Sequence, residues 1–384
     1  MKICFFTPAY PGKHNTSEFA FVKQLVDAIA NRGVECHVIS PYNFFHYRKK
    51  TVTFEEYKSG KGRVIVYRPY YFSFSHIRGL QWIKNASLNC AIQSAVAKLP
   101  LDIDAVYGHF WSSGYIGYKF AKKQNLPLFV ATGESSIKDL YTKPKDQKDF
   151  SDYVKGVICV SSKNRDESIR LGLTTLEKCE VFPNAVNTRL FYKRDKIECR
   201  EILGIPQDAF VVVFVGWFIH RKGSARVAEA LSRFENVKSI FIGRPASVKS
   251  SMNVDSQEPQ CEGILFKGEV PHEKIPQYLS AADCFVLPTL KEGCCNAVVE
   301  ALSCGLPVIS SNLPFNWDVL DESNSIMIDP LSIDEIARAI SHLRDNKNMR
   351  EQLSEGALKK AKQLTIDKRA DGILDFIKAR IIES

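Results

Sequence analysis

The sequence lacks any long hydrophobic run. Its longest apolar stretch, residues 210–219 (FVVVFVGWFI), has about half the length that a helix needs to cross a bilayer. The N-terminal segment MKICFFTPAYPGKH is interrupted by Pro8, Pro11 and Lys13 before it reaches the length of a secretory signal core. These absences argue against a membrane span and a signal peptide, so we expect a cytoplasmic protein.

The sequence has 11 cysteines but no CxxC pair. The number is odd, and many of the cysteines lie in strand-like runs such as KICFF, VECHVIS and DCFVLP, as small reduced core residues do. The adjacent Cys294 and Cys295 would form only a strained disulfide ring, and a lone pair without His or Cys partners is a poor zinc site. No DxD motif with an obvious role is present either, so we expect no metal.

Glycine-rich nucleotide loops and repeats are also missing. No GxGxxG follows the first strand-like run of either half, which argues against a dinucleotide-dependent dehydrogenase. The 384 residues are 45% hydrophobic and 25% charged, as in an ordinary globular protein. Because single cores stop growing near about 250–300 residues, the chain is long enough for two or more domains.

Positive charge is concentrated in the first quarter of the chain. Residues 1–100 contain 14 Lys and Arg against 5 Asp and Glu, so they carry the whole net charge of +9. Basic and aromatic residues are interleaved in FFHYRKK (44–50) and YRPYYFSFSHIRGLQWIK (67–84), which favours peripheral contact with an anionic membrane through residues 44–84 and not nucleic-acid binding. A solvated rim over core aromatics is an equally good interpretation of this segment.

Strand-like and amphipathic helical segments alternate along the whole chain, which indicates the α/β class with doubly wound parallel sheets. The charged stretch 192–208 separates two such series. We therefore predict one domain over residues 1–190 and a second over 195–365, with a helix over about 366–384 packed back on the first domain. Ligands of such sheets bind outside the carboxyl ends of the strands, so the chemistry should lie in a cleft between those ends.

The turn FIHRKGS follows the strand-like run FVVVFVGW and precedes a helical segment. It places two cations, Arg221 and Lys222, and a glycine, Gly223, at a strand-to-helix junction. Backbone N–H groups at a helix N-terminus and adjacent cations suit a diphosphate. A solvated basic turn is the alternative.

The stretch EGCCNAVVE places Glu292 and Glu300 eight residues apart. We predict that Glu292 lies on a loop and that residues 296–303 form a helix. Eight residues at helical rise span roughly 12 Å, comparable to the distance between the sugar and the ribose of a nucleotide sugar. The two carboxylates could accept hydrogen bonds from hydroxyls at its two ends; a capping acid and a surface glutamate are the alternative.

Several motifs in order resemble the retaining glycosyltransferases of family 4, which have the GT-B architecture. They are PNAVNTRLF (183–191), VGWFIHRKG, FKGEVP, ADCFVLPT and the E-x7-E pattern of EGCCNAVVEALSCGLPVIS. The resemblance covers nearly the whole chain and is strongest over about 157–330. It implies two Rossmann-like domains that face a central cleft.

The resemblance also implies roles for residues. Glu292 would contact the hydroxyls of the donor sugar, Glu300 the ribose, and Lys222, with Arg221, the diphosphate. His109 matches a histidine beside the reacting sugar. Further donor-binding positions are Gly12, at the loop that approaches the phosphates, Val270, whose backbone would meet the base, and Gly293, Cys295, Asn296 and Ala297 around the helix start.

Three positions depart from the family pattern. Trp217 replaces an arginine five residues before Lys222, so either Arg221 supplies the missing charge or Lys222 acts alone. The segment GKHNTSEFAF has one glycine where the family has a pair, which leaves the phosphate contact of Gly12 open. Finally, VATGESSI lacks the histidine that the family often has after this strand. Glu134 either takes over acceptor recognition or has no chemical role.

The activity implied by the resemblance is transfer of a hexose or related sugar from a nucleoside-diphosphate sugar to a glycan or lipid-linked acceptor, with retention, without a metal or cofactor. Lys222, Arg221 and helix amides would stabilise the leaving diphosphate, and the departing phosphate would take the acceptor proton. Surface polysaccharide biosynthesis is the expected setting. A nucleotide-sugar epimerase and a non-catalytic sugar-nucleotide-binding subunit are the alternatives.

Overall fold

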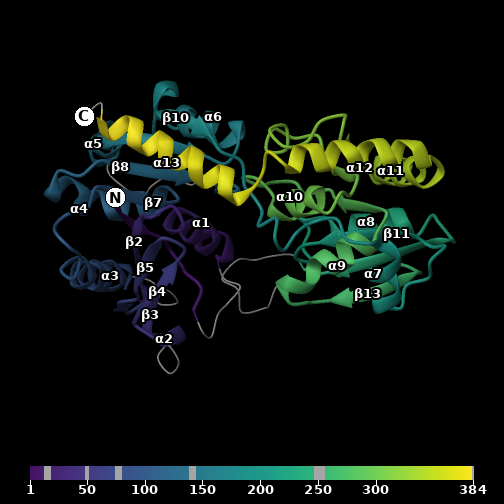
Figure 1. The fold of residues 1–384 in the computed structure, drawn as a ribbon, viewed down its shortest axis with the longest axis horizontal. Coiled ribbons are helices and arrows are strands. Elements are labelled where there is room, and N and C mark those ends of the chain that lie inside the picture. Colours follow the sequence, from purple (N-terminus) through teal and green to yellow (C-terminus); the bar gives the residue numbers. More distant parts are fainter. Residues whose placement is uncertain (13–18, 48–51, 74–79, 138–143, 246–255, 383–384) are drawn as a thin grey trace. The chain divides into compact units, whose positions relative to one another are not determined.

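The computed structural model describes residues 1–12, 19–47, 52–73, 80–137, 144–245 and 256–382. The predicted membrane-contact segment 44–84 therefore lies partly outside the described residues, at 48–51 and 74–79. The chain forms two compact units (Figure 1). Unit 1 comprises Met1–Val160, Asn164–Phe182 and Arg369–Ser384, and unit 2 comprises Ser161–Lys163 and Pro183–Lys368. The division after Phe182 precedes the domain boundary predicted at residues 190–195.

Unit 1 is built on an eight-stranded sheet in the order β10-β9-β8-β7-β1-β2-β5-β4. All neighbours pair in parallel except β4, an antiparallel edge strand on β5. The strands are β1 (Lys2–Phe6), β2 (Glu35–Ile39), β4 (Phe54–Ser59), β5 (Gly62–Tyr67), β7 (Ala105–His109), β8 (Leu128–Thr132), β9 (Val154–Cys159) and β10 (Cys179–Val181). The short β3 (Tyr42–Asn43) and β6 (Tyr70–Tyr71) pair separately.

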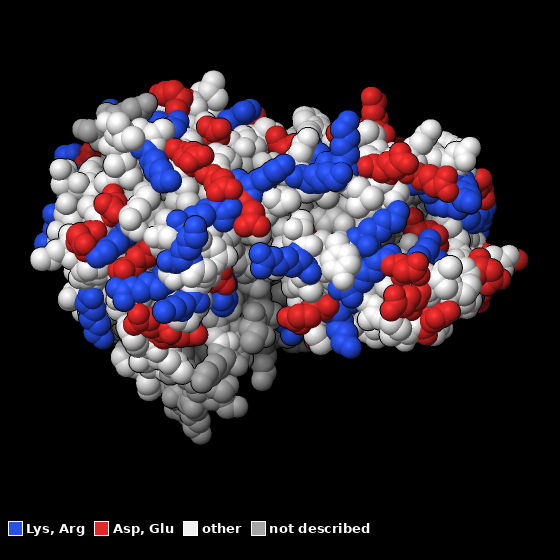
Figure 2. Space-filling view, in the orientation of Figure 1, with Lys and Arg blue, Asp and Glu red and all other residues white. Residues whose placement is uncertain are grey.

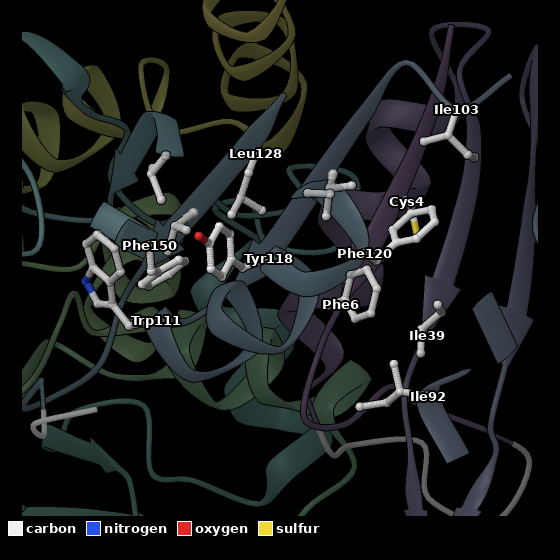
Figure 3. Close-up of a cluster of buried hydrophobic side chains, with 14 of the residues drawn as sticks. Cys4, Phe6, Ile39, Ile92, Ile103, Trp111, Tyr118, Phe120, Leu128 and Phe150 are labelled. Carbon is white, nitrogen blue, oxygen red and sulfur yellow. The ribbon is translucent and has the colours of Figure 1, made fainter. Parts of the chain in front are cut away.

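Helices cover this sheet because its parallel strands need crossover connections. They are α1 (Ala20–Ala30), α2 (Phe44–Tyr47), α3 (Gln81–Val96), α4 (Trp111–Gln124), α5 (Pro144–Tyr153) and α6 (Ser162–Arg170), with the 3₁₀ turn η1 (Leu176–Lys178). One buried cluster joins α4 and α5 to the sheet (Figure 3). In it the ring of Phe150 meets Trp111 and Tyr118 with centroids 5.9 and 5.5 Å apart.

The C-terminal helix α13 (Ile366–Ile382) packs on unit 1 (Figure 1). Its Phe376 lies 6.2 Å from Phe129 of β8 and 5.8 Å from Phe182, centroid to centroid. Gly156 of β9 makes room for this ring, since a Cβ there would lie 2.7 Å from it. The chain therefore passes from unit 1 into unit 2, and its last helix belongs to unit 1 again.

Unit 2 is built on a six-stranded parallel sheet in the order β13-β12-β11-β14-β15-β16. The strands are β11 (Phe210–Val215), β12 (Val237–Ile242), β13 (Ile264–Gly268), β14 (Cys284–Leu287), β15 (Val308–Ser311) and β16 (Ser325–Ile328). The helices are α7 (Lys196–Leu203), α8 (Ser224–Leu231), α9 (Ile275–Ala281), α10 (Asn296–Ser303), α11 (Ile333–Asp345) and α12 (Lys347–Ala361), with the 3₁₀ turn η2 (His272–Lys274).

In both sheets the order of the parallel strands reverses once. The reversal lies between β1 and β7 in unit 1 and between β11 and β14 in unit 2. In open α/β sheets, the carboxyl ends of the strands at such a reversal leave a crevice in which ligands bind. The sequence prediction of doubly wound α/β sheets is confirmed, and these two edges are where site residues should be sought.

Candidate functional site

In unit 2, the loops after β11 and β14 meet at the strand-order reversal. Gly223 ends the first loop in a left-handed conformation (φ +83°), and a Cβ on it would lie 2.8 Å from the carbonyl oxygen of Pro288 in the second loop. The amide of Leu290 donates to the Arg221 carbonyl oxygen over 2.8 Å. This close backbone contact brings Arg221 and Lys222 beside Glu292.

Three groups converge on one oxygen of Glu292. Lys222 Nζ and Arg221 Nη1 each lie 2.7 Å from Glu292 Oε1, and Thr289 Oγ1 donates to the same atom over 2.9 Å. The side chains of Lys222 and Glu292 are only 14% and 13% exposed. Burial by itself would raise the pKa of Glu292, but Lys222 and Arg221 more than offset it, so the pKa lies below its ordinary value. Glu292 is therefore a carboxylate.

Lys222 is the buried cation of this group. Burial pulls the pKa of Lys222 down, but the carboxylate of Glu292 opposes this effect through its charge and its hydrogen bond, and the pKa is raised. The thiol of Cys295 lies 3.9 Å from Lys222 Nζ. Burial raises the pKa of Cys295, which indicates a protonated thiol with a packing role.

The N-terminus of α10 lies next to this charge cluster. Cys295 is its N-cap residue and supplies no side-chain cap. Gly293 and Cys295 are buried, and Asn296 and Ala297 in the first helical turn are half-buried. Asn184 donates to the carbonyl oxygen of Cys294 over 2.8 Å and fixes the loop before the helix. An anion placed here would meet both side-chain cations and the positive end of α10.

Glu300 lies two turns along α10 and is held by His272. His272 Nε2 is 2.9 Å from Glu300 Oε1, and the Glu300 side chain is 12% exposed. This hydrogen bond raises the pKa of His272 above its ordinary value. His272 follows β13, two residues after Val270, so the contact brings the Val270 segment to α10.

The predicted residues of unit 2 thus share one edge of its sheet, while His109 and Gly12 belong to unit 1. His109 ends β7, and Gly12 follows β1, so they flank the reversal of the unit 1 sheet. Sequence reasoning missed Thr289, His272 and Asn184. The available signal for the first two was a polar residue shortly after a strand, two residues after β14 for Thr289 and four residues after β13 for His272, and only the tertiary contact identifies Asn184.

His109 is enclosed by aromatic rings. It is 6% exposed, and its ring centroid lies 4.7 Å from Phe110, 5.5 Å from Phe21 and 6.4 Å from Tyr107. Its Nδ1 atom has no hydrogen-bond partner among the described residues. Burial, assisted by the charge of Arg369, lowers the pKa of His109 to about 3. The imidazole is therefore neutral near pH 7.

Glu134 holds the start of α4. Its carboxylate accepts hydrogen bonds from the amides of Trp111 (2.8 Å) and Gly133 (2.9 Å) and from Thr132 Oγ1 (2.7 Å). The N-cap residue Phe110 has positive φ (75°) and offers no side-chain cap, so the Glu134 carboxylate supplies the cap. Burial raises the pKa of Glu134, and these hydrogen bonds, which lower it, offset the effect only in part. Of the two roles left open, these contacts favour a structural one.

Arg68 is a buried cation under the loop that carries Gly12. It is 1% exposed, its Nη2 donates to the Pro11 carbonyl oxygen over 2.7 Å, and its Nη1 pairs with Glu55 over 2.8 Å. A Cβ on Gly12 would lie 3.5 Å from the Arg68 guanidinium, an ordinary contact distance. Sterics alone therefore do not require glycine at position 12. The burial of Arg68 differs from the sequence prediction, which placed the basic residues of 67–84, Arg68 among them, at the surface.

Comparison with known proteins agrees with this geometry. The family described as Glycosyltransferase Family 4 matches residues 20–190, and the family described as Glycosyl transferases group 1 matches residues 195–360. The chain belongs to the family 4 glycosyltransferases. The resemblance to family 4 glycosyltransferases predicted from the sequence motifs is confirmed, and so is the GT-B fold.

Relatives and solved structures agree with this assignment. The teichuronic acid biosynthesis glycosyltransferase TuaC of Bacillus subtilis is 28% identical over 361 residues, covering 89% of this chain and 88% of TuaC. A D-inositol 3-phosphate glycosyltransferase of Acidothermus cellulolyticus is 23% identical, covering 77% of this chain and 72% of that protein.

Two solved structures share the fold over nearly the full length. Sucrose-phosphate synthase of Thermosynechococcus elongatus superposes with a TM-score of 0.80 at 18% identity, covering 100% of both chains. HepE of Anabaena, solved with UDP, superposes with a TM-score of 0.73 at 16% identity, covering 99% of this chain and 100% of HepE.

The described residues contain no group of three or more His, Cys, Asp or Glu side chains arranged to bind a metal ion. Among the same residues, no helix has both the length and the apolar character that a bilayer span requires.

Proposed function

We propose that this glycosyltransferase is a retaining enzyme that needs no metal and transfers a hexose or related sugar from a nucleoside-diphosphate sugar to a glycan or lipid-linked acceptor. The observation that carries the proposal is the convergence of Lys222 and Arg221 on Glu292 beside the N-terminus of α10. This arrangement offers positive charge for a diphosphate and a carboxylate for sugar hydroxyls within one small region. Structures of HepE with UDP support the donor class.

The two cations suit the leaving group of the reaction. Negative charge develops on the diphosphate as the bond to the sugar breaks, and Lys222, Arg221 and the α10 amides would stabilise it. Before the donor binds, Glu292 neutralises the same cations. The diphosphate would compete for them and free Glu292 to accept hydrogen bonds from the sugar. Arg221 would thus supply the charge that Trp217 cannot.

The acceptor proton would pass to the departing phosphate, as we predict from the family resemblance. The described properties of His109 agree with this route. Its low pKa leaves it neutral, so it can offer or accept one hydrogen bond to the donor sugar but holds no proton to donate as an acid near pH 7. Glu300, held by His272, would accept hydrogen bonds from the ribose.

The proposed setting is surface polysaccharide biosynthesis at the membrane, supported by the similarity to TuaC. Within residues 44–84, Phe45, Phe72 and Trp82 are 48%, 43% and 67% exposed. Lys and Arg are intermixed with Asp and Glu on the face shown in Figure 2, so the described residues of this face offer no basic patch, and the exposed aromatic residues carry the support for membrane contact. Absence of binding to anionic vesicles at low salt would contradict the membrane contact.

The deciding experiment measures nucleoside diphosphate release with and without acceptor. A thermal-shift screen of uridine, guanosine and adenosine diphosphate sugars first identifies the donor, because a ligand of the folded state raises the unfolding temperature. A transferase releases diphosphate only when acceptor glycan is added, and the NMR coupling of the product reports retention. Full turnover in EDTA would support metal independence.

The same assay separates the alternatives. An epimerase would convert the donor without acceptor, and a binding subunit would show a thermal shift without release for any acceptor tried. Either result would overturn the proposed function.

A further inference from the structure

Trp217 is an exposed aromatic residue at the edge of the candidate site. It follows β11 and is 43% exposed. A Cβ on the preceding Gly216 would lie 3.6 Å from Lys222 Cδ, so the stem of Lys222 passes over Gly216, directly beside Trp217. Trp217 therefore presents part of a large apolar ring to solvent near a buried cation.

Trp217 is bordered by the loops after β12 and β13. The guanidinium carbon of Arg244 lies 5.6 Å from the centre of the Trp217 ring. Arg244 also pairs with Glu269, with Nε 3.6 Å from Oε1. The backbones are also joined, because the amide of Phe218 donates to the Arg244 carbonyl oxygen over 2.8 Å. The ring is therefore presented on a fixed loop with a cation over it.

The order of the strands places these groups along one line. Glu292 follows β14, Lys222 and Trp217 follow β11, Arg244 follows β12, and Glu269 follows β13. Neighbouring strands are about 4.8 Å apart, so the edge from β14 to β13 spans roughly 14 Å. This length suits an extended nucleotide sugar with its sugar at Glu292 and its diphosphate at Lys222.

The direction of the nucleoside follows from the contact of Glu300 with His272. His272 belongs to the 3₁₀ turn η2 after β13, so its contact with Glu300 joins α10 to the segment that follows the edge strand of this row. If the proposed donor binds with its ribose near Glu300, its base would extend toward the β12 and β13 loops. Arg244 follows β12, and its guanidinium lies over the Trp217 ring.

We propose that Trp217, backed by Arg244, is a stacking platform for the nucleobase of the donor. This inference rests on the proposed function and adds to it a residue that recognises the nucleoside. Bases stack on aromatic rings whatever their sequence identity, and a guanidinium over the ring strengthens such a site. The platform would contribute affinity for the nucleoside and none for the diphosphate.

The test compares nucleoside diphosphates with inorganic pyrophosphate. Dissociation constants of UDP, GDP and ADP are measured by calorimetry for the wild type, Trp217→Ala, Trp217→Phe and the control Trp317→Ala, and pyrophosphate is measured as a competitor. Trp317 is a matched control because it is exposed (56%) in the same unit but follows β15, on the other side of β14.

For the diphosphate that binds the wild type best, we expect Trp217→Ala to weaken binding roughly 5- to 100-fold, the range of base stacking. Trp217→Phe should retain most of the affinity, Trp317→Ala should match the wild type, and competition by pyrophosphate should change less than about twofold. Equal losses for pyrophosphate and nucleoside diphosphate, or no loss for either, would overturn the platform while leaving the proposed function intact. A wild type that binds no nucleoside diphosphate would overturn the proposed function itself.

Discussion

Glu292 is the residue on which the charges of the candidate site converge. Its oxygen accepts from Thr289 and pairs with Lys222 and Arg221 in a largely buried position. Removing one partner of such a pair leaves the other charge without compensation, which costs more than the pair contributes in the intact protein. Substitutions here should therefore alter both the chemistry and the local charge balance.

We expect Lys222→Ala and Glu292→Ala each to lower kcat/KM by about 10²- to 10³-fold, the usual loss for a group that stabilises a developing charge. Steady-state kinetics with the identified donor measure this, and circular dichroism checks the fold. Lys291→Ala is the matched control, since Lys291 is exposed and contributes only its carbonyl oxygen to the site. Near-normal turnover in either alanine variant would contradict the assignment.

His109 should make the stability depend on pH. Its folded-state pKa, about 3, lies below the ordinary value of 6.5, so the unfolded chain binds the proton first as the pH falls. The free energy of unfolding therefore keeps the full contribution of His109 above about pH 6.5. It loses this contribution as the pH falls toward the folded-state pKa. Between pH 7 and pH 5 the loss from this residue should approach about 2 kcal/mol.

Urea unfolding of the wild type and of His109→Gln at the two pH values measures this contribution. The variant should lose less stability on acidification, because it has no group that titrates at this position. Equal losses in the two proteins would show that His109 is not buried in its neutral form.

At the scale of elements, the junction between β11 and α8 positions both cations. Gly223 precedes α8 and is in close contact with Pro288, so the junction depends on the absence of a side chain. Gly204, after α7, has a similar positive φ (66°), but a Cβ there would meet nothing within 4 Å. Comparing substitutions at these two glycines therefore separates the cost of backbone strain from the cost of steric overlap.

Gly204→Ala should cost about 1–2 kcal/mol, the strain of a left-handed residue with a side chain. Gly223→Ala should cost more, because the new Cβ also collides with Pro288, and it should weaken nucleoside diphosphate binding by displacing Arg221 and Lys222. Denaturant unfolding and calorimetric titration measure the two effects. If both variants bound the ligand like the wild type, the junction would not position the cations.

The elements around the site were largely predictable. The helix predicted over residues 296–303 has the bounds of α10, because a glycine and a proline follow it closely in the sequence. The antiparallel edge strand β4 was not predicted. Its residues alternate in exposure at the edge of the sheet, and the two-residue turn Gly60-Lys61 joins it to β5, so the alternation and the hairpin turn were local signals that the sequence analysis did not use.

At the scale of the whole molecule, the path of the chain links the two units. The chain passes into unit 2 near Phe182 and returns at Arg369, so the stability of unit 1 depends on α13. Phe376 is 5% exposed and packs on strands from the first half of the sequence. Unit 1 is therefore complete only when the last helix is in place.

Phe376→Ala should destabilise unit 1 by about 3–5 kcal/mol, the usual cost of truncating a buried phenylalanine. Hydrogen exchange should show faster exchange in β8 and β9, while α8 and α10 of unit 2 keep wild-type protection. Asp375→Ala, at an exposed position of the same helix, is the control. Equal acceleration in both units would show that they unfold as one.

The sequence by itself determined the fold class, the family and the residues that carry charge at the site. Hydrophobic periodicity is local, and the order and spacing of Lys222, Glu292 and Glu300 can be read directly from the chain. Only the tertiary structure decided which groups meet: that Arg221 and Lys222 share one oxygen of Glu292, that His272 holds Glu300, and that Glu134 caps α4. Those contacts join segments many residues apart, and the order of the parallel strands, which no local pattern encodes, brings them together.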